Sequence, residues 1–347
     1  MIYGANGYTG QLIAREAVRL GLKPILAGRS RQKVAALAAQ LGCKHAVFSL
    51  EDQTATVIAL QDVAAVLNCA GPFSATAAAM MQACLALHIH YFDISGEVSV
   101  FELAHGLHAK AQRAGMVLCP GVGFDVVPTD CIAAVLKQAL PTATALTLGF
   151  ESNSKLSVGT TKTVIESLGA GGWVRRNGAL VNIPHAERQR RIDFGAGEKN
   201  AVAVAWGDVS TAFFTTGIAN IEFFVPMAES AARKLQRLNQ VRWVVGSSVV
   251  QSMLKYRASR HAVKPIEKPD ATTDTFVWGE AVTPEGKKLV ARVRTANPYA
   301  VTVYASLEIV VDVLTTTKTP GFYTPSQLMG ARFIETLPGA TGIVVSG

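Results

Sequence analysis

The stretch "MIYGANGYTG" (residues 1–10) decides the fold, because three glycines follow directly on a short apolar start. Gly4, Gly7 and Gly10 are spaced by three, and the residues after them repeat with helical periodicity through residue 20. A strand that turns through glycines into a helix is typical of a dinucleotide-binding turn. Only a residue without Cβ lets the backbone approach a pyrophosphate, and a helix start offers it N–H groups and a positive dipole end. The alternative is a glycine-rich tight turn without a ligand.

The same alternation of short apolar runs and helical patterns continues to residue 120. We expect strands at 1–3, 23–28, 45–50, 64–68, 88–95 and 115–120, joined by helices at 9–20, 31–41, 53–60, 75–87 and 99–114. Six strands joined by helical crossovers form a doubly wound parallel α/β sheet. The ligand crevice of such a sheet lies at the carboxyl ends of its strands.

The residues after the second predicted strand select the cofactor. A chain that binds NAD usually places Asp or Glu there to hold the ribose 2′-hydroxyl. This chain has "AGRSRQK" (27–33) instead, with no acid between Glu16 and Glu51. Arg29, Ser30 and Lys33 would suit a 2′-phosphate, so we expect NADP rather than NAD. The alternative is a solvated helix start.

The loop "NCAGPF" (68–73) follows the fourth predicted strand at the same edge. Gly71 and Pro72 predict a tight turn, and the small Cys69 and Ala70 would let the loop lie against the cofactor. Cys69 has no acid–base partner near it in the sequence, so a packed thiol is preferred over a nucleophile.

Three residues are candidates for acid–base work at the edge of the cleft. Tyr91 and Asp93 lie in "YFDISGE" (91–97), and Asp125 follows the sixth predicted strand. Asp93 and Glu97 could orient a substrate or a water, and the alternative for both is to cap the helix that begins near residue 98. For Asp125 the alternative is an Asx turn before the helix expected at 128–139.

From residue 143 the pattern changes toward antiparallel strands. We expect strands in 144–151 and 201–209 and a hairpin over 276–295 turned by Pro284–Gly286. A helix is expected over 158–172, with Thr160, Thr161 and Lys162 at its start placed to receive an anionic substrate group. The stretch 213–224 is expected to be a cleft loop that presents Asn220.

Bulk properties bound the class of protein. A chain of 347 residues with 49% hydrophobic and 17% charged residues suits two folded domains. The net charge of +8 is spread along the chain, and no basic run carries a stacking array of aromatics, so no nucleic acid partner is expected. His88, His90, His105 and His108 lack the spacing of a metal site, so no metal is expected.

Five cysteines without a CxxC motif, and no signal peptide, favour reduced thiols and a cytoplasmic location. No window reaches the roughly 18 uninterrupted apolar residues of a membrane span. The stretch 241–260 is read as a buried or interface helix, with a peripheral membrane or synthase contact as the alternative. The apolar stretches 240–256 and 300–314 would suit a homodimer surface.

Several motifs occur together in a fixed order: "GANGYTG" (4–10), "LAGRS" (26–30), "NCAGPF", "YFDISGE" and "PGVGFDVVPTD" (120–130). In this order the sequence resembles the saccharopine dehydrogenase-like oxidoreductases, a family that includes saccharopine reductases and trans-acting enoyl reductases. The later "TPSQLMGARFIETLPG" (324–339) resembles the C-terminal segment of the same group.

The resemblance implies an NADP-dependent oxidoreductase. It implies a Rossmann domain over 1–130, an inserted mixed α+β substrate or dimerisation domain over 131–318, and a C-terminal segment, 319–347, that returns to the first domain. It implies cofactor contacts for the following residues: Gly4, Asn6, Gly7, Tyr8, Thr9, Gly10, Arg29, Ser30, Ala70, Gly71 and Pro72. It assigns no catalytic acid, because branches of the family perform different reactions.

The expected function is hydride transfer from NADPH to an activated C=C or C=O of a fairly apolar, acyl- or lipid-like small molecule. Saccharopine carries three carboxylates, and a site for it should show several arginines in pairs. Arg175, Arg176 and the arginines of 188–191 are expected in hairpin-like surface stretches, which favours the apolar substrate. The alternatives are a C–N reductase of the saccharopine reductase type and a non-catalytic NADP-binding partner protein.

Overall fold

The computed structural model describes residues 1–154, 161, 165, 168–169, 171–247, 250–254 and 275–347. The chain divides into two compact units. Unit 1 contains residues 1–127 and 298–330, and unit 2 contains the described residues of 128–297 together with 331–347. Each unit is built around its own sheet.

Unit 1 is a doubly wound parallel α/β domain, as the sequence predicts. Its described strands have the order β15-β6-β5-β4-β1-β2-β3, and all the pairs are parallel. These strands are β1 (Ile2–Tyr3), β2 (Leu26–Gly28), β3 (His45–Val47), β4 (Ala65–Asn68), β5 (His90–Asp93), β6 (Val117–Cys119) and β15 (Gly321–Phe322). Although β1 has only two residues, it pairs with both β2 and β4 at the centre of the sheet.

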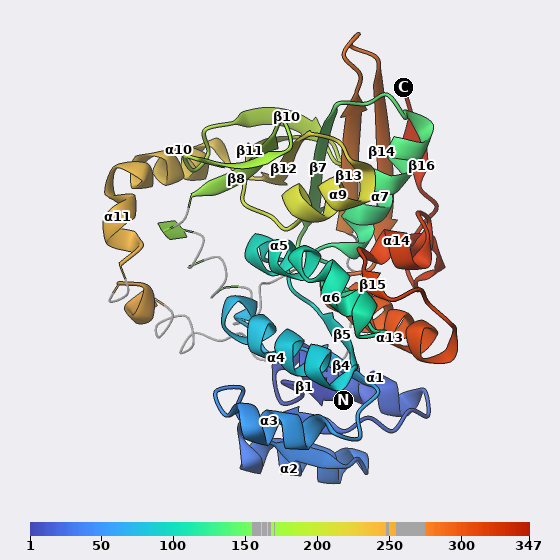
Figure 1. Cartoon of the computed structure of the whole chain (residues 1–347). Helices are drawn as coiled ribbons and strands as arrows, with labels where there is room; N and C mark the ends of the chain where they lie inside the picture. The colour runs from blue at the N-terminus through green and yellow to red at the C-terminus, as the bar shows by residue number, and fades with distance from the viewer. Residues whose placement is uncertain (155–160, 162–164, 166–167, 170, 248–249, 255–274) are drawn as a thin grey trace. The chain divides into compact units, whose positions relative to one another are not determined.

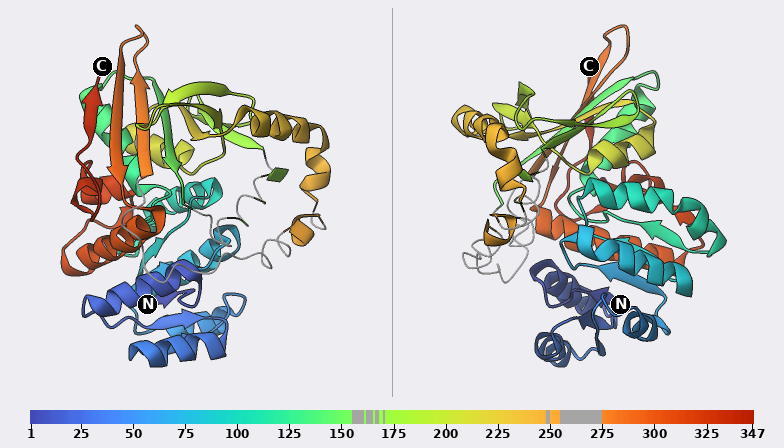
Figure 2. Two further views of the ribbon diagram at one scale, coloured as in Figure 1. Left: turned by 180° about the vertical axis from the view of Figure 1, so that it is seen from behind. Right: turned by 60° about the vertical axis from the view of Figure 1, so that its left-hand side comes forward.

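Helices cover both faces of this sheet. Figure 1 shows α4, α5 and α6 in front of the strands, and Figure 2, seen from behind, shows α1 and α13 on the other face. The helices of unit 1 are α1 (Tyr8–Arg19), α2 (Arg31–Leu41), α3 (Gln53–Leu60), α4 (Phe73–Leu87), α5 (Val98–Gly106), α6 (His108–Arg113), α13 (Pro298–Thr315) and α14 (Pro325–Met329). The single helix predicted over 99–114 is two helices, because Gly106 ends α5 and α6 starts anew after Leu107.

Unit 2 is built on a mixed sheet. Its described strands run in the order β10-β11-β12-β7-β13-β14-β16, and β8 pairs with β12 and β9. The β7–β12 pair is parallel and its neighbours are antiparallel. The strands are β7 (Ala145–Ser152), β8 (Gly172–Arg176), β9 (Ala179–Ile183), β10 (Gln189–Asp193), β11 (Glu198–Ala203), β12 (Asn220–Pro226), β13 (Thr275–Val282), β14 (Lys288–Thr295) and β16 (Val344–Ser346).

Helices α7 and α9 lie on the same face of the unit 2 sheet (Figure 1). A Cβ at Gly279 of β13 would lie 2.5 Å from Ile132 of α7, so the missing side chain sets how closely this helix packs. The helices of unit 2 are α7 (Val127–Ala139), α9 (Asp208–Thr216), α10 (Glu229–Leu238) and α11 (Arg242–Val245), with 3₁₀ turns at Asn239–Val241 and Phe333–Thr336.

Two sequence expectations for unit 2 differ from the structure, and a third agrees with it. The strand expected over 201–209 stops at Ala203, and Asp208 then begins α9. The cleft loop expected over 213–224 is instead the end of α9 followed by β12. The hairpin of β13 and β14 agrees with the prediction, with Gly286 at φ +85° in its turn.

The unit boundaries differ from the expected ones at the C-terminal end. Residues 298–318, expected in the inserted domain, belong to unit 1, because the buried side of α13 packs on α1 and on β4 and β5. Residues 331–347, expected to return to the first domain, belong to unit 2, where β16 pairs with β14. Of the expected returning segment, β15 and α14 lie in unit 1.

The apolar residues of α13 are explained by packing inside unit 1. This helix has 18 residues of mean hydropathy 1.3, enough by length and composition to cross a membrane, but half of it is buried. Ala300, Val303 and Ile309 are completely buried. The buried residues of the stretch 300–314 therefore pack within unit 1, and its use as a homodimer surface stays a prediction.

Candidate functional site: the carboxyl edge of the unit 1 sheet

The turn between β1 and α1 is as close-packed as a dinucleotide-binding turn requires. Gly4 has φ +78°, and a Cβ there would lie 2.8 Å from the backbone nitrogen of Ala70. A Cβ on Gly10 would lie 2.4 Å from the carbonyl oxygen of Gly4. No side chain larger than hydrogen fits at either position, so the glycines bring the turn against the start of α1.

The start of α1 carries no cap of its own. Gly7 occupies the N-cap position without a side-chain hydrogen bond, and the first turn contains no acid. The first i to i−4 bond of α1 runs from the Gln11 N–H to the Gly7 carbonyl oxygen at 2.9 Å. The amides of Thr9 and Gly10 precede it and have no acceptor within the helix, which is the arrangement that binds phosphate.

Asn6 connects this turn to the second strand. A Cβ on Gly28 would lie 2.7 Å from the Asn6 Oδ1, so the Asn6 side chain rests on the end of β2. The Asn6 carbonyl accepts a hydrogen bond from Gln11 Nε2 at 3.0 Å. Asn6 therefore fixes the turn from both sides.

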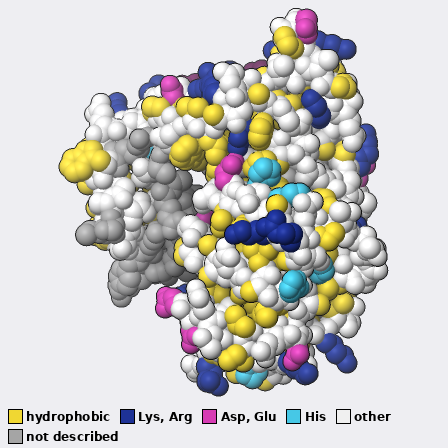
Figure 3. Space-filling view, viewed as in Figure 1, with side chains coloured by type: hydrophobic (Ala, Val, Ile, Leu, Met, Phe, Trp, Pro, Cys, Tyr) yellow, Lys and Arg dark blue, Asp and Glu magenta, His cyan; other side chains and the backbone are white. Residues whose placement is uncertain are grey.

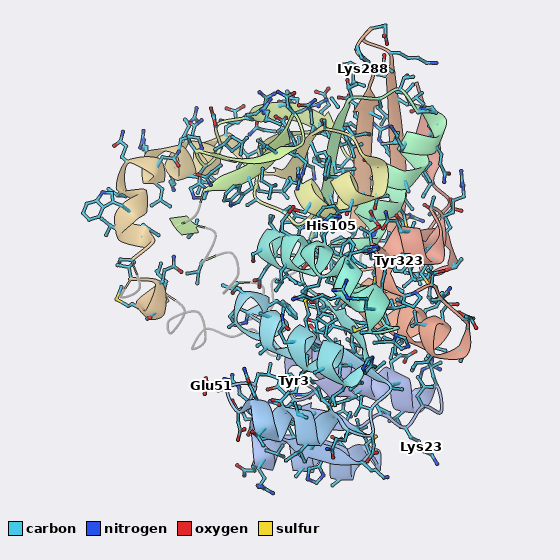
Figure 4. The ribbon with its side chains drawn as sticks, viewed as in Figure 1. Tyr3, Lys23, Glu51, His105, Lys288 and Tyr323 are labelled. Atoms are coloured by element: carbon cyan, nitrogen blue, oxygen red, sulfur yellow. The ribbon has the colours of Figure 1, made fainter. Side chains whose placement is uncertain are left out.

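The start of α2 is also open to an anion. Ser30 is its N-cap residue and makes no side-chain cap bond, and the first turn of α2 contains no acid. Arg29 and Lys33 are exposed on either side of Ser30. Burial raises the pKa of the Tyr3 hydroxyl, and the nearby Arg29 charge partly opposes that shift. Figure 4 shows Tyr3 on β1, at the strand end that leads into the glycine turn, with Glu51 beyond it. The structure thus keeps Arg29, Ser30 and Lys33 beside the same edge as the glycines.

The loop after β4 is held by the buried side chain of Asn68. Its Oδ1 accepts a hydrogen bond from the Ala70 N–H at 3.0 Å, and Thr76 Oγ1 donates to the Ala70 carbonyl at 2.7 Å. The Gly71–Pro72 peptide is cis. These bonds hold Ala70 against Gly4, so the "NCAGPF" loop and the glycine turn form one surface.

Cys69 has the character of a packed thiol. Burial is the main cause that raises its pKa, and the Asp93 carboxylate adds to the shift. A thiol held in its neutral form is a poor nucleophile. The structure therefore agrees with the preference for packing at Cys69.

Asp93 and Tyr91 are predicted to lie at the edge of the cleft, but both side chains are fully buried. Tyr91 donates its hydroxyl to Asp93 Oδ2 at 2.8 Å. Asp93 Oδ1 accepts from the N–H groups of Ser95 and Gly121, both at 2.9 Å. Burial raises the pKa of Asp93 to about 6, although these hydrogen bonds oppose the shift. The carboxylate ties the ends of β5 and β6 together, so we assign both residues to structure.

Glu97 also has a role that the sequence did not reveal. Its two carboxylate oxygens accept the N–H groups of Phe73 and Ser74, at 2.8 and 2.7 Å. These are the first amides of α4, whose own N-cap residue is Pro72 and has no side-chain cap. Glu97 therefore closes the start of α4 with a negative charge, whereas the starts of α1 and α2 have no such cap.

Asp125 is the acid that fits a catalytic role at this edge. It is partly exposed, in the segment between β6 and α7. A Cβ on Gly96 would lie 3.1 Å from its Oδ2, so the carboxyl packs beside the chain that leaves β5. Burial raises the pKa of Asp125 to about 6. A carboxyl poised near neutral pH is suited to proton transfer.

Of the substrate-binding candidates, Thr160 and Lys162 lie outside the described residues, as does much of the helix expected over 158–172. Thr161 is described as partly exposed. Asn220 begins β12, and its amide is engaged on both sides, donating to the Thr144 carbonyl and accepting the Asn177 N–H, each at 3.0 Å.

Asn220 nevertheless lines a cavity of about 490 Å³ that lies wholly within unit 2. Four arginines also line it, namely Arg175, Arg176, Arg188 and Arg190. The sequence places these arginines in separate surface stretches, whereas the sheet brings them to one cavity. The arginines thus lie in hairpins, as the sequence predicts, but the sheet also brings them together, which the sequence does not reveal.

The histidines of unit 1 hold the backbone together. His90 Nδ1 accepts the Val117 N–H at 2.9 Å, and burial lowers the pKa of His90. His108 Nδ1 accepts the Phe322 N–H at 3.1 Å. His105, on α5, contacts Phe322 edge-on, with ring centroids 5.4 Å apart. Within the described ranges no three His, Cys, Asp or Glu side chains come together as metal ligands.

One aromatic contact at the turn was also missed. Tyr299, at the start of α13, meets Tyr8 edge-on with ring centroids 4.9 Å apart. The two residues are 291 positions apart in the chain, and no local pattern connects them.

Figure 3 shows Lys and Arg side chains singly or in small groups on the visible face, in line with a dispersed net charge.

Comparison with known proteins agrees with this geometry. Residues 1–119 match the family model described as the saccharopine dehydrogenase NADP binding domain. A saccharopine dehydrogenase-like oxidoreductase of Rattus norvegicus is 27% identical over 209 residues, which cover 53% of this chain and 49% of that protein. A Mycobacterium tuberculosis protein named as a trans-acting enoyl reductase is 31% identical over 147 residues, 40% of this chain and 35% of the relative. The matches thus span half or less of these relatives.

A solved structure supports the architecture. The apo saccharopine dehydrogenase (L-Glu forming) of Saccharomyces cerevisiae matches all of this chain and 99% of its own, with a TM-score of 0.60 and 11% identity. At this identity the likeness shows the fold. The family model and the named relatives agree with the resemblance expected from the ordered motifs, and residues 1–119 are similar to an NAD(P)-binding domain of the saccharopine dehydrogenase type.

The role of Glu97 predicts a defined loss of stability. Glu97→Ala leaves two amides at the start of α4 without their acceptor, which should lower the free energy of unfolding by about 1–3 kcal/mol. The exposed Glu51, changed to Ala, is the matched control and should have little effect. Chemical denaturation of the three proteins measures the difference, and equal stabilities would contradict the capping role.

Proposed function

We propose that this chain is an NADP(H)-dependent oxidoreductase that transfers a hydride to an activated C=C or C=O. The observation that carries the proposal is the pair of open helix starts at one sheet edge. The α1 start follows glycines that no side chain could replace, and the α2 start follows Arg29 without an acid. The likeness of residues 1–119 to an NADP-binding domain supports the same assignment.

The residues present fit NADP at both phosphate positions. The turn of Gly4, Gly7 and Gly10, with the first amides of α1, would hold the pyrophosphate. Arg29 and Ser30, with Lys33 one helical turn further, would hold the 2′-phosphate. Ala70, Gly71 and Pro72 would lie against the nicotinamide half, since Ala70 touches the glycine turn.

Bound NADPH supplies the hydride, and the chain orients the acceptor and supplies a proton. We assign the proton to Asp125. Asp93 and Tyr91 are sealed in the interior, whereas Asp125 is partly exposed at the carboxyl edge of β6. With a pKa of about 6, Asp125 holds its proton in a useful fraction of molecules near neutral pH.

For the acceptor, a fairly apolar enoyl or keto compound is the first candidate. The relative named as a trans-acting enoyl reductase supports it. A C–N reductase acting on an amino acid and a 2-oxoacid is the second candidate. The specific observation in its favour is the convergence of Arg176, Arg188 and Arg190 on one cavity, since arginine pairs suit carboxylates.

The cofactor assignment predicts a selective loss on removing Arg29. Arg29→Ala should weaken NADPH binding by about 10–100-fold, because charge-assisted hydrogen bonds to the 2′-phosphate are lost. NADH binding should change little. Lys23 precedes β2 at its other end and is exposed, so Lys23→Ala is the matched control. Fluorescence titration of each protein with both cofactors measures this, and tighter binding of NADH by the unaltered chain would overturn the assignment.

A substrate panel separates the candidate reactions. Oxidation of NADPH is followed with enoyl thioesters in one arm and 2-oxoacid plus amine pairs in the other. Turnover in the first arm only supports the apolar acceptor, and turnover in the second arm only supports the C–N reductase. Tight NADPH binding with no turnover in either arm would contradict an enzymatic role and indicate a binding partner.

The assignment of Asp125 predicts a pH effect of definite sign. A general acid must be protonated, so kcat/KM should fall as the pH rises through about 6. Asp125→Asn should lower kcat by about 10²–10⁴-fold and remove this limb of the profile, leaving the Kd for NADPH unchanged. If Asp125→Asn retains both the rate and the pH profile, another group donates the proton.

A further inference from the structure

The arginine-lined cavity of unit 2 has no role in the cofactor site described above. It lies over β7 and β12, where Thr147, Asn220 and Glu222 form part of its lining, and it is bordered by residues of β8 and of the segment that enters β10. Its lining contains four arginines and two acids, Glu187 and Glu222, and one of the arginines, Arg190, is paired with Glu280, so about one positive charge is left in excess.

The charges in the cavity are unevenly paired. Glu222 Oε1 accepts from Arg176 at 2.8 Å and forms an ion pair with the Arg188 Nε at 2.7 Å. Two guanidinium groups therefore share a single carboxylate oxygen. Each guanidinium has five N–H donors, and in the described part of the chain Glu222 engages one donor of each. The pair thus retains donors and an excess positive charge beside an open cavity.

The other two arginines are fixed by the protein itself. Arg190 makes a bidentate pair with Glu280, at 3.1 and 3.2 Å, and lies 5.3 Å from the centre of the Trp278 ring. Arg175 is buried and donates to the carbonyls of Val209 and Gly178. The guanidinium groups of these two arginines are therefore held by partners within the protein. Arg176 and Arg188, whose side chains are 42% and 49% exposed, are the ones placed to meet a ligand.

We infer that this cavity binds an oxyanion, a carboxylate or a phosphate, between Arg176 and Arg188. A guanidinium fork matches either group in a bidentate manner, and the anion balances the charge that Glu222 leaves uncompensated. Glu222 holds the two forks in place and limits the site to ligands that tolerate a neighbouring carboxylate. This is a binding property of unit 2, and it goes beyond the proposed reaction because it requires no cofactor.

The test is calorimetric titration of the full chain, without nicotinamide cofactor and at low ionic strength. Inorganic phosphate is the probe in one arm and glutarate in the other. Saturable binding of phosphate alone supports a phosphate-bearing ligand, of glutarate alone a carboxylate-bearing one, and of both the shared oxyanion site. If the unaltered chain binds neither probe, the inference is wrong.

Substitutions of the two arginines test whether the oxyanion binds in this cavity. Arg188→Gln and Arg176→Gln should each weaken it by at least about tenfold, because each removes charge-assisted donors. Both side chains are half exposed, so the variants should fold, and their thermal unfolding checks this. Arg191→Gln is the matched control, since Arg191 follows Arg190 on β10, pairs with the exposed Glu198 and does not line the cavity.

Glu222→Gln should not weaken the binding of the oxyanion, in contrast to the two arginine variants. Removing this carboxylate raises the positive charge of the cavity, so the oxyanion should bind at least as tightly as in the unaltered chain. Binding that survives both arginine changes, or that falls equally with Arg191→Gln, would place the anion elsewhere and overturn the inference.

Discussion

The structure of unit 1 depends on a backbone-to-backbone contact that leaves no space for a side chain. A Cβ on Gly4 would meet the backbone of Ala70 at 2.8 Å, and one on Gly10 would meet the Gly4 carbonyl at 2.4 Å. Because of these contacts, the turn after β1, the loop after β4 and the start of α1 form a single surface. A two-residue strand at the sheet centre can position that surface, since β1 is paired on both sides.

Some of the acids near this surface stabilise the fold, and one is available for proton transfer. Asp93 ties the ends of β5 and β6, and Glu97 closes the start of α4. Each neutralises N–H groups that would otherwise compete for an anion. The starts of α1 and α2 have no side-chain cap, and Asp125 is a partly exposed carboxyl whose side chain caps neither of them. The edge is therefore selective because some of its helix starts are already closed.

Local patterns predicted what depends on neighbouring residues. The glycine spacing, the absence of an acid after β2 and the alternation of short strands and helices indicated the parallel sheet of unit 1, and the Pro284–Gly286 turn indicated the β13–β14 hairpin. The missed features join distant residues. Glu97 caps a helix 23 to 24 residues before it, Tyr299 packs on Tyr8, and arginines from two hairpins reach one cavity. The sequence also suggests a catalytic role for polar residues such as Asp93, because a local pattern does not show that the side chain is buried.

The seventh strand of unit 1 bears on how the chain is made. Strand β15 pairs with β6, and the Phe322 amide donates to His108, 214 residues earlier. During synthesis on the ribosome, β6 therefore emerges with one edge unprotected and stays so until all of the intervening chain has been translated. Contacts of such sequence separation are slow to form. Unit 1 is thus completed only after most of unit 2 has been translated, and until then its sheet has an unpaired edge at β6.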